Sequence, residues 1–306
     1  MTVINMLSLG EEGIAVADEQ SSTPLRKYNV AEKLHILNGS AIYGGSGISD
    51  MIKEVYEISN DELGKIKEEK KEVSLNDIYH LTNNVLINYK NHLKNNVLRA
   101  NISYDLDDFL TGHLSRANKP LDESSKNYAA GLLKDIDEKT SMVALIGGKE
   151  SGKFNIYEIT SNGFSFKSSR PYASIGSGED ESGKVLSSYV SHLPRNKREN
   201  IDKTEGLSKI IEATNASSRL NVGVGGAPSI MYFGKEIIIP NENQCILATE
   251  IVEGLTNNFL EKDIAHEYLS RLIFDNENFQ KIEEEIKTKL GKDWEKLNKV
   301  LRGYKE

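Results

Sequence analysis

The order in which strand-like and helix-like segments follow one another constrains the fold most strongly. Short apolar runs separated by turn residues occupy residues 1–50 and return at 141–178 and 221–240, whereas helical periodicity occupies 48–100 and 179–220. Strands and helices that alternate in blocks are typical of layered α+β proteins. The order therefore predicts two antiparallel sheets that pack face to face, with helices on the outer faces.

Ten segments have the pattern of short strands, with apolar runs between turn residues. In chain order they are TVINML, GIAVAD, KLHIL, AIYGGSG, SMVALIGG, KFNIYEIT, FSFKSS, YASIGSG, NVGVGG and SIMYFGKEIIIP. We expect the first four strands to form one antiparallel sheet, because the turns between them are mostly tight. A glycine-rich turn joins the fifth strand to the sixth.

Helical periodicity predicts four helices in the body of the protein. Two of them lie between Ile48 and about Ala100, where they are expected to cover one face of the first sheet, and Ser74 is the expected N-cap of the second. The other two helices follow the second block of strands, as EDESGKVLSSYVSHL and KTEGLSKIIEATNASSRL.

Two segments lie outside this alternation. Residues 101–140 are polar, and we expect a loop-rich insertion with one further helix in a main domain of residues 1–240. Residues 241–306 are charged and helical in pattern, so we expect a helical C-terminal extension. Its last helix has one apolar stripe, formed by Phe279, Ile282, Ile286 and Leu290. The stripe could pack on its own subunit, which we favour, or face a partner.

Composition excludes several classes of function. The chain of 306 residues has a net charge of −8 and no basic tract, so nucleic-acid binding is not expected. Cys245 is the single cysteine and the six histidines are scattered, which argues against disulfides, metal sites and a cofactor and is typical of the cytoplasm. No apolar run can span a bilayer and no signal peptide is recognisable, so we expect no membrane association and an N-terminus at or next to residue 1.

One segment has the spacing of a phosphate-binding loop. Gly147, Gly152 and Lys153 match G-x-x-x-x-G-K after an apolar strand. Such a loop needs a serine or threonine at the next position and a helix behind it, but Phe154 and a strand-like segment follow. The favoured interpretation is a hairpin, and nucleotide binding is kept as an alternative.

The first strands contain residues that point to catalysis. Thr2 follows the initiator Met1, and removal of Met1 would give Thr2 a free α-amine. A threonine hydroxyl is a poor nucleophile without an adjacent base, and an α-amine with a pKa of about 7.7–8.0 can be that base. Asp18 and Lys33 are expected beside it, because a lysine would lower the pKa of the amine and an aspartate would hold the lysine in place.

Together these segments resemble the β-type subunits of the proteasome family, which are N-terminal nucleophile hydrolases. The resemblance covers residues 2 to about 240 and rests on TVINMLSLGEEGIAVADEQ, the lysine of KLHIL, YGGSGISD, IGSG, and NVGVGG followed by SIMYF. It implies a four-layer αββα sandwich. It also implies that Thr2 is the catalytic nucleophile and that Asp18 and Lys33 complete a triad, with Lys33 one residue earlier than the family pattern.

The same resemblance implies three supporting residues. Gly45 resembles the glycine whose backbone N–H stabilises the oxyanion, with Ser46 and Gly47 as alternatives for that position. Ser177, in IGSG, resembles the serine that supports the amine of the nucleophile. Asn221 stands where the family has an aspartate that supports the same serine, so a neutral amide replaces a charge.

The activity implied by the resemblance is that of a threonine-type endopeptidase acting on peptides or unfolded proteins. A homo-oligomeric ring is expected, and an AAA+ unfoldase or another regulator could be its partner. Two alternatives keep the fold. The same acyl-enzyme could serve an amidase, a peptide ligase or a transpeptidase, or the chain could be a non-catalytic structural subunit of a proteasome-like assembly.

Overall fold

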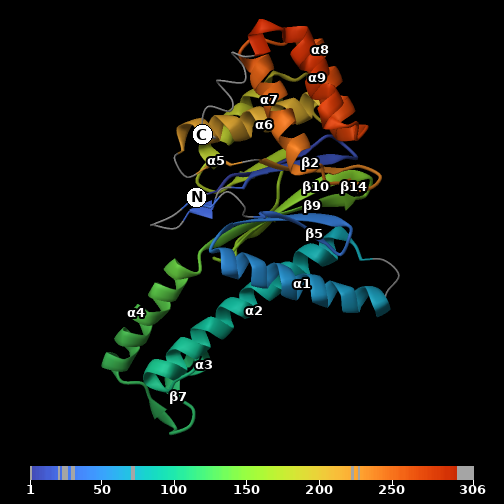
Figure 1. Ribbon diagram of the computed structural model, residues 1–306. Helices are drawn as coiled ribbons and strands as arrows, with labels where there is room; N and C mark the ends of the chain where they lie inside the picture. Colours follow the sequence, from blue (N-terminus) through green and yellow to red (C-terminus); the bar gives the residue numbers. More distant parts are fainter. Residues whose placement is uncertain are drawn as a thin grey trace.

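The computed structural model describes residues 2–19, 21–22, 27–28, 32–69, 73–221, 224–226 and 228–294. Figure 1 shows two antiparallel sheets that pack face to face, with helices on the outer side of each. The expectation of an α+β protein with two antiparallel sheets is therefore confirmed. None of the helices within the described ranges is long and apolar enough to cross a membrane.

The first sheet contains the N-terminal strand and has the strand order β12-β1-β2-β13-β14. Its strands are β1 (Ile4–Ser8), β2 (Gly13–Asp18), β12 (Tyr172–Ile175), β13 (Pro228–Phe233) and β14 (Ile237–Ile238). Ile4 lies between Ile175 of β12 and Ala17 of β2. The residues that precede β1 are therefore placed between the ends of two neighbouring strands.

The second sheet has the strand order β11-β10-β9-β6-β5. Its strands are β5 (Leu34–Leu37), β6 (Ala41–Gly47), β9 (Met142–Glu150), β10 (Lys153–Thr160) and β11 (Ser165–Lys167). Two short ladders lie outside both sheets: β3 (Ser21–Ser22) with β4 (Lys27–Tyr28), and β7 (His113–Leu114) with β8 (Lys119–Pro120).

The expectation that the first four strands form one sheet is wrong. β1 and β2 belong to the first sheet, whereas β5 and β6 belong to the second. Each pair completes its hydrogen bonding with a strand from far along the chain, because β2 pairs with β13 and β6 pairs with β9. Sheet membership is decided by these nonlocal pairs, about which the local apolar pattern of a strand contains no information.

Apolar side chains from both sheets fill the space between them. Ile4 and Met6 of β1 pack in the same cluster as Ile42 of β6 and Phe154 of β10. Phe154 is 2% exposed, and a Cβ atom added at Gly13 would lie 2.4 Å from its ring. The ring therefore fills a space between the sheets that the glycine leaves open.

Helices α1 (Ser49–Glu69) and α2 (Leu75–Ile102) cover the outer face of the second sheet. As expected, Ser74 caps α2: its Oγ accepts a hydrogen bond from the backbone N–H of Asp77, whose carboxylate accepts one from the N–H of Ser74. Val55 of α1 and Ile78 of α2 are buried against strands β6 and β9.

The second half of α2 leaves the sheet and forms an arm with the segment that follows it (Figure 1). The arm contains α3 (Leu106–Thr111), β7, β8 and α4 (Glu123–Lys139). Lys90 and Lys94 of α2 both pair with Asp137 of α4, at 2.8 and 3.0 Å. The expected insertion at 101–140 thus has, besides its one expected helix, a second short helix and a two-strand ladder.

Helices α5 (Glu179–His192) and α6 (Lys203–Leu220) cover the outer face of the first sheet, with a 3-10 turn at Arg195–Lys197 between them. The buried Asn5 of β1 donates to Thr214 Oγ1 of α6 at 3.0 Å. Asn221 is the C-cap of α6, and residues 224–226 are not in a strand, so the strand expected at NVGVGG is absent from its described residues. Residues 222–223 lie outside the described residues.

The C-terminal helices pack on the helices of the first sheet. They are α7 (Glu242–Thr256), α8 (Lys262–Leu269), a π-helical turn at Ser270–Phe274, and α9 (Phe279–Leu290). Ile282 and Ile286 of α9 are buried in the cluster that contains Leu207 and Ile211 of α6. The apolar stripe of α9 therefore packs on its own chain, as the favoured interpretation expects. The rest of the stretch predicted as helix, from residue 295 onward, lies outside the described residues.

We expect Phe154→Ala to lower the free energy of unfolding by about 3–5 kcal/mol, because it removes a buried ring from the space between the sheets. Phe164 is the matched control, since it is 73% exposed in the turn after β10. Phe164→Ala should change the stability by less than about 0.5 kcal/mol. Urea denaturation followed by circular dichroism measures both, and equal effects would contradict the packing of the two sheets.

Candidate active site

Thr2 lies beside the turn that follows β12. Its backbone nitrogen donates a hydrogen bond to Ser177 Oγ at 3.1 Å, and Ser177 Oγ in turn donates to the Thr2 carbonyl oxygen at 3.4 Å. The backbone N–H of Gly178 also donates to the Thr2 carbonyl oxygen, at 3.3 Å. The nitrogen that removal of Met1 would convert into an amine is thus already bound to the serine that the sequence singled out.

The strand register explains this placement. Ile4 is opposite Ile175, so Thr2 falls opposite Ser177 when the ladder is extended by two residues. Gly176 has a φ of +99°, and a Cβ atom there would lie 2.2 Å from the Thr2 carbonyl oxygen. The close approach of the two segments therefore requires glycine at this position. The pattern IGSG contains this glycine, but its role is visible only in the structure.

Asp18 and Lys33 form a buried ion pair at the same end of the sandwich. Lys33 Nζ lies 2.7 Å from Asp18 Oδ1, and the two side chains are 7% and 1% exposed. Asp18 Oδ1 also accepts from the backbone N–H of Val3 at 2.8 Å, and Oδ2 accepts from the N–H of Gly225 at 3.2 Å. The carboxylate therefore connects the lysine to the residue next to Thr2, and the structure brings together the three residues of the expected triad.

Burial shifts both members of this pair toward their neutral forms. It raises the pKa of Asp18, and Lys33 together with two backbone N–H donors opposes that rise. It lowers the pKa of Lys33, and Asp18 opposes that fall. Lys33 is therefore held in place by the carboxylate of Asp18 and releases its proton more readily than a lysine in water.

The three candidates for the oxyanion position lie at the end of β6. A Cβ atom at Gly45 would be 2.4 Å from Ile52 of α1, so Gly45 faces the helix. Ser46 faces the other way, and its Oγ is 3.0 Å from the position of a Cβ atom at Gly176. Gly47 has a φ of +130° and ends the strand. Ser46 is the only one of the three with a side chain, and it points toward the contact between Gly176 and Thr2.

Asn221 does not reach Ser177 in the described part of the chain. Its backbone N–H donates to the Ser217 carbonyl oxygen at 2.9 Å, and no hydrogen bond joins its side chain to Ser177. The buried Ser217 has the closer contact, because its Oγ donates to the Gly178 carbonyl oxygen at 2.7 Å. Ser217 therefore anchors the turn that holds Ser177, a role that sequence reasoning missed because a serine inside a helix has no distinguishing pattern.

The alternative nucleotide site has the geometry of a hairpin. Lys153 begins β10 directly after β9, and the ladder pairs Lys153 with Glu150. Its ammonium group lies 2.8 Å from the carboxylate of Glu199. The expected hairpin is confirmed, and the helix that a phosphate-binding loop needs does not follow it. Nowhere in the described ranges do three or more His, Cys, Asp or Glu side chains gather closely enough to hold a metal ion.

We expect Lys33→Met to destabilise the fold by about 3 kcal/mol at pH 7, because it leaves a buried carboxylate without its counter-charge. Lys33 opposes the rise in the pKa of Asp18, so its removal raises that pKa further. A folded state that binds a proton more tightly than the unfolded chain loses stability as the pH rises above about 4. Urea titrations should therefore show a larger loss at pH 7 than at pH 4.5.

Two variants serve as controls. Lys53→Met removes a lysine that is 71% exposed and pairs with Glu57, and it should change the stability by less than about 0.5 kcal/mol at both pH values. Adding Asp18→Asn to Lys33→Met should recover part of the loss at pH 7, since no charge is then buried. A loss that is equal at the two pH values, together with no recovery, would contradict a charged buried pair.

Comparisons with known proteins do not assign this site to a family. No family model matches the sequence, and no curated protein matches it significantly. The resemblance to the β-type subunits of the proteasome family therefore rests on the quoted residues.

Proposed function

We propose that the protein is a threonine-type peptidase of the N-terminal nucleophile class, with a four-layer αββα sandwich as its fold. Thr2 is the nucleophile after removal of Met1. One observation supports this proposal above the others: the backbone nitrogen of Thr2 lies 3.1 Å from Ser177 Oγ, next to the buried pair of Asp18 and Lys33. A free amine and a hydroxyl on one residue form a complete nucleophile and base.

The reaction proceeds through an ester. The Thr2 amine takes the proton of Thr2 Oγ as the oxygen attacks the carbonyl carbon of the substrate, and a tetrahedral oxyanion forms. The carbon–nitrogen bond then breaks, and the proton passes from the Thr2 ammonium group to the departing amine. Water attacks the ester, gives one proton to the Thr2 amine, and releases the acid product. The last step returns that proton to Thr2 Oγ.

The surrounding residues set the protonation and position of the amine. A free α-amine has a pKa of about 7.7–8.0, and the nearby charge of Lys33 favours its neutral, basic form. Asp18 fixes Lys33 and, through Val3, the backbone next to Thr2. Ser177 holds the nitrogen itself. The oxyanion is assigned to a backbone N–H at the end of β6, among Gly45, Ser46 and Gly47.

The substrate class comes from the family resemblance, and the chemistry of Thr2 is compatible with it. The nucleophile acts on an amide carbonyl, so peptides or unfolded proteins are the proposed substrates. Assembly into a homo-oligomeric ring and an AAA+ unfoldase partner are part of the same proposal and come from the family resemblance alone.

Peptide hydrolysis by three forms of the protein tests the nucleophile. We expect Thr2→Ala to lower kcat/KM by about a thousandfold or more, because it removes the attacking oxygen. Thr2→Ser keeps a hydroxyl and an amine on the same residue and should retain measurable hydrolysis. Release of amines from a pool of short peptides, followed with an amine-reactive dye, measures all three.

Thr111→Ala is the matched control, since it removes the same hydroxyl from the end of α3 in the arm. It should leave hydrolysis unchanged within about twofold. Hydrolysis by Thr2→Ala at the level of the unmodified protein would contradict the proposal.

A further inference from the structure

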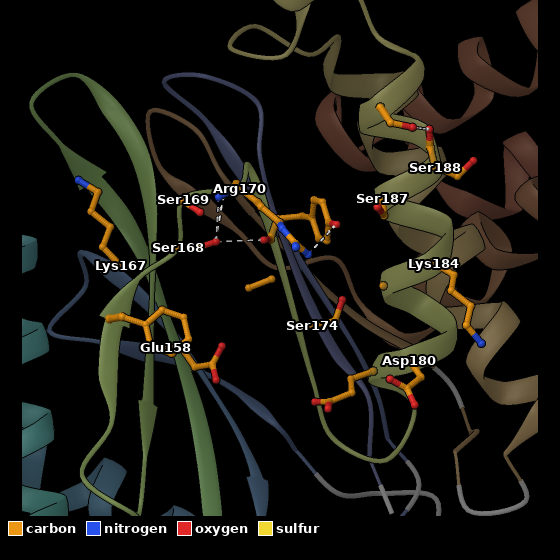
Figure 2. A pocket seen from close by; sticks show the side chains of 16 residues that line it. Glu158, Lys167, Ser168, Ser169, Arg170, Ser174, Asp180, Lys184, Ser187 and Ser188 are labelled. Atoms are coloured by element: carbon orange, nitrogen blue, oxygen red, sulfur yellow. Dashed lines mark hydrogen bonds between the residues drawn. The ribbon is translucent and has the colours of Figure 1, made fainter.

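A cleft of about 860 Å³ opens on the side of the sandwich where β12 is the edge strand. Figure 2 shows its walls, which are the strands that carry Glu158 and Lys167 on one side and helix α5 on the other. Strand β12 runs between these walls. Ser174 lies on that strand, three residues before the serine that binds Thr2.

The cleft follows the backbone edge of β12. Tyr172, Ala173 and Ser174 all line it, although the side chains of consecutive residues in a strand point to opposite faces. Ala173 belongs to the core between the sheets, and Tyr172 belongs to the core under α5. A cleft that is lined by all three residues therefore contacts the backbone of β12 along its free edge, between the two faces of the sheet. β12 pairs only with β1 among the described strands. Ser168 Oγ donates to the outward carbonyl oxygen of Tyr172 at 3.2 Å, so the edge is open to another strand from Ser174 onward.

The register identifies the backbone groups at this edge. The N–H of Ser8 donates to the carbonyl oxygen of Pro171 at 2.6 Å, so Pro171 faces β1. Backbone groups of alternate residues point to opposite edges of a strand, and Ser174 lies three residues after Pro171. The backbone N–H and carbonyl groups of Ser174 therefore point away from β1, toward the cleft. Within the described residues, no hydrogen bond involves its outward N–H or carbonyl group, and its Oγ is buried without a partner. One residue thus presents three unsatisfied polar groups beside the cleft.

Three carboxylates line the cleft, those of Glu158, Glu179 and Asp180. Glu158 follows Phe154 and Ile156 on the face of β10 that forms the core between the sheets. Glu179 begins α5, two residues after Ser177. No ion pair with another described residue involves Glu158 or Glu179. Burial raises the pKa of both, and the charge of Glu179 adds to the rise at Glu158.

The cations of the cleft are engaged elsewhere or lie at its other end. Lys167 pairs with Glu150 at 3.0 Å, and Lys184 pairs with Glu181 at 2.9 Å. Arg170 precedes β12, at the end of the strand away from Thr2, and donates to the hydroxyl of Tyr172 at 3.3 Å. Among the residues that the structure describes, no cation pairs with Glu158 or Glu179 at the end nearest to Thr2.

This end faces the strand that carries Ser46. Glu158 is opposite Leu145 of β9, which is opposite Gly44 of β6. Two strand spacings, about 10 Å, thus separate Glu158 from β6, where Ser46 approaches the contact of Gly176 with Thr2. A peptide that follows the edge of β12 from Ser174 would continue toward the turn at Ser177, whose opposite side contacts Thr2.

We propose that this cleft binds the substrate as an added β-strand. The peptide backbone pairs with the N–H and carbonyl groups of Ser174, and a lysine or arginine side chain of the peptide lies between Glu158 and Glu179. Adding a strand gives affinity through the main chain, while the side-chain contact gives specificity. The inference deepens the proposed peptidase function, on which it rests, by assigning it a preference for extended, basic peptides.

Binding of labelled peptides to the Thr2→Ala protein tests the cleft without cleavage. Fluorescence anisotropy should show that an extended peptide with lysine and arginine binds about tenfold more tightly than the same peptide with glutamine at those positions. The double variant Glu158→Gln with Glu179→Gln should lose this preference. Methylation of alternate amide nitrogens of the basic peptide should weaken its binding about tenfold or more, since a methylated amide cannot donate to a neighbouring strand.

Glu138→Gln is the matched control, because it removes the same charge from the arm, where Glu138 is 68% exposed and pairs with Lys134. It should keep the preference for the basic peptide, and circular dichroism should show that all variants are folded. Equal binding of the two peptides, or an unchanged preference in the double variant, would overturn the inference.

The proposal for the nucleophile and the proposal for the cleft can be contradicted separately. Hydrolysis by the unmodified protein that shows no preference for basic peptides would overturn the inference about the cleft and leave the peptidase proposal standing. Selective binding of the basic peptide by a protein that cleaves nothing would support the cleft and contradict the peptidase proposal.

Discussion

The buried carboxylate of Asp18 is the interaction on which the candidate site depends. It accepts hydrogen bonds from Val3 at the start of the first strand, from Gly225 before β13, and from Lys33 before β5 of the second sheet. Three segments distant in sequence therefore meet at one side chain that is 1% exposed. A buried charge is costly unless it is paired and hydrogen-bonded, so this arrangement tolerates little displacement of any of the three segments.

The other half of the site is held by the turn after β12. Ser217 fixes the carbonyl of Gly178 from helix α6, and Gly176 allows the turn to approach Thr2 within the distance of a hydrogen bond. Thr2 is thus positioned from one side by the carboxylate and from the other by Ser177. Both supports come from packed elements, which is the condition for a preorganised nucleophile.

Local patterns predicted much of the secondary structure. The apolar runs of β1, β2, β5 and β6 and the cap at Ser74 are features of short segments, and they appear where the sequence placed them. The division of those four strands between two sheets was not predictable, because it depends on pairing with β9 and β13. The described residues of NVGVGG are not in a strand for the same reason, since glycine and valine alternate equally well in a loop.

The candidate site shows the same limit. Thr2, Asp18 and Lys33 were identified from their types and order and Ser177 from the family resemblance, and the structure brings them together. Ser217 and Glu158 were missed, since a helical serine and a glutamate in a strand acquire meaning only from their neighbours in space. Gly45 was preferred for the oxyanion N–H from the family resemblance, and the structure shows that its Cα faces α1, whereas the Ser46 side chain faces the turn at Gly176.

Intact-mass measurement of the purified protein, before and after reaction with a threonine-reactive electrophile, tests most directly whether the hydroxyl and the amine of Thr2 act as one unit. We expect the protein to lack the mass of Met1 and to gain a single adduct, which is absent from Thr2→Ala. A protein that retains Met1, or an adduct that forms equally on Thr2→Ala, would contradict the proposed role of Thr2.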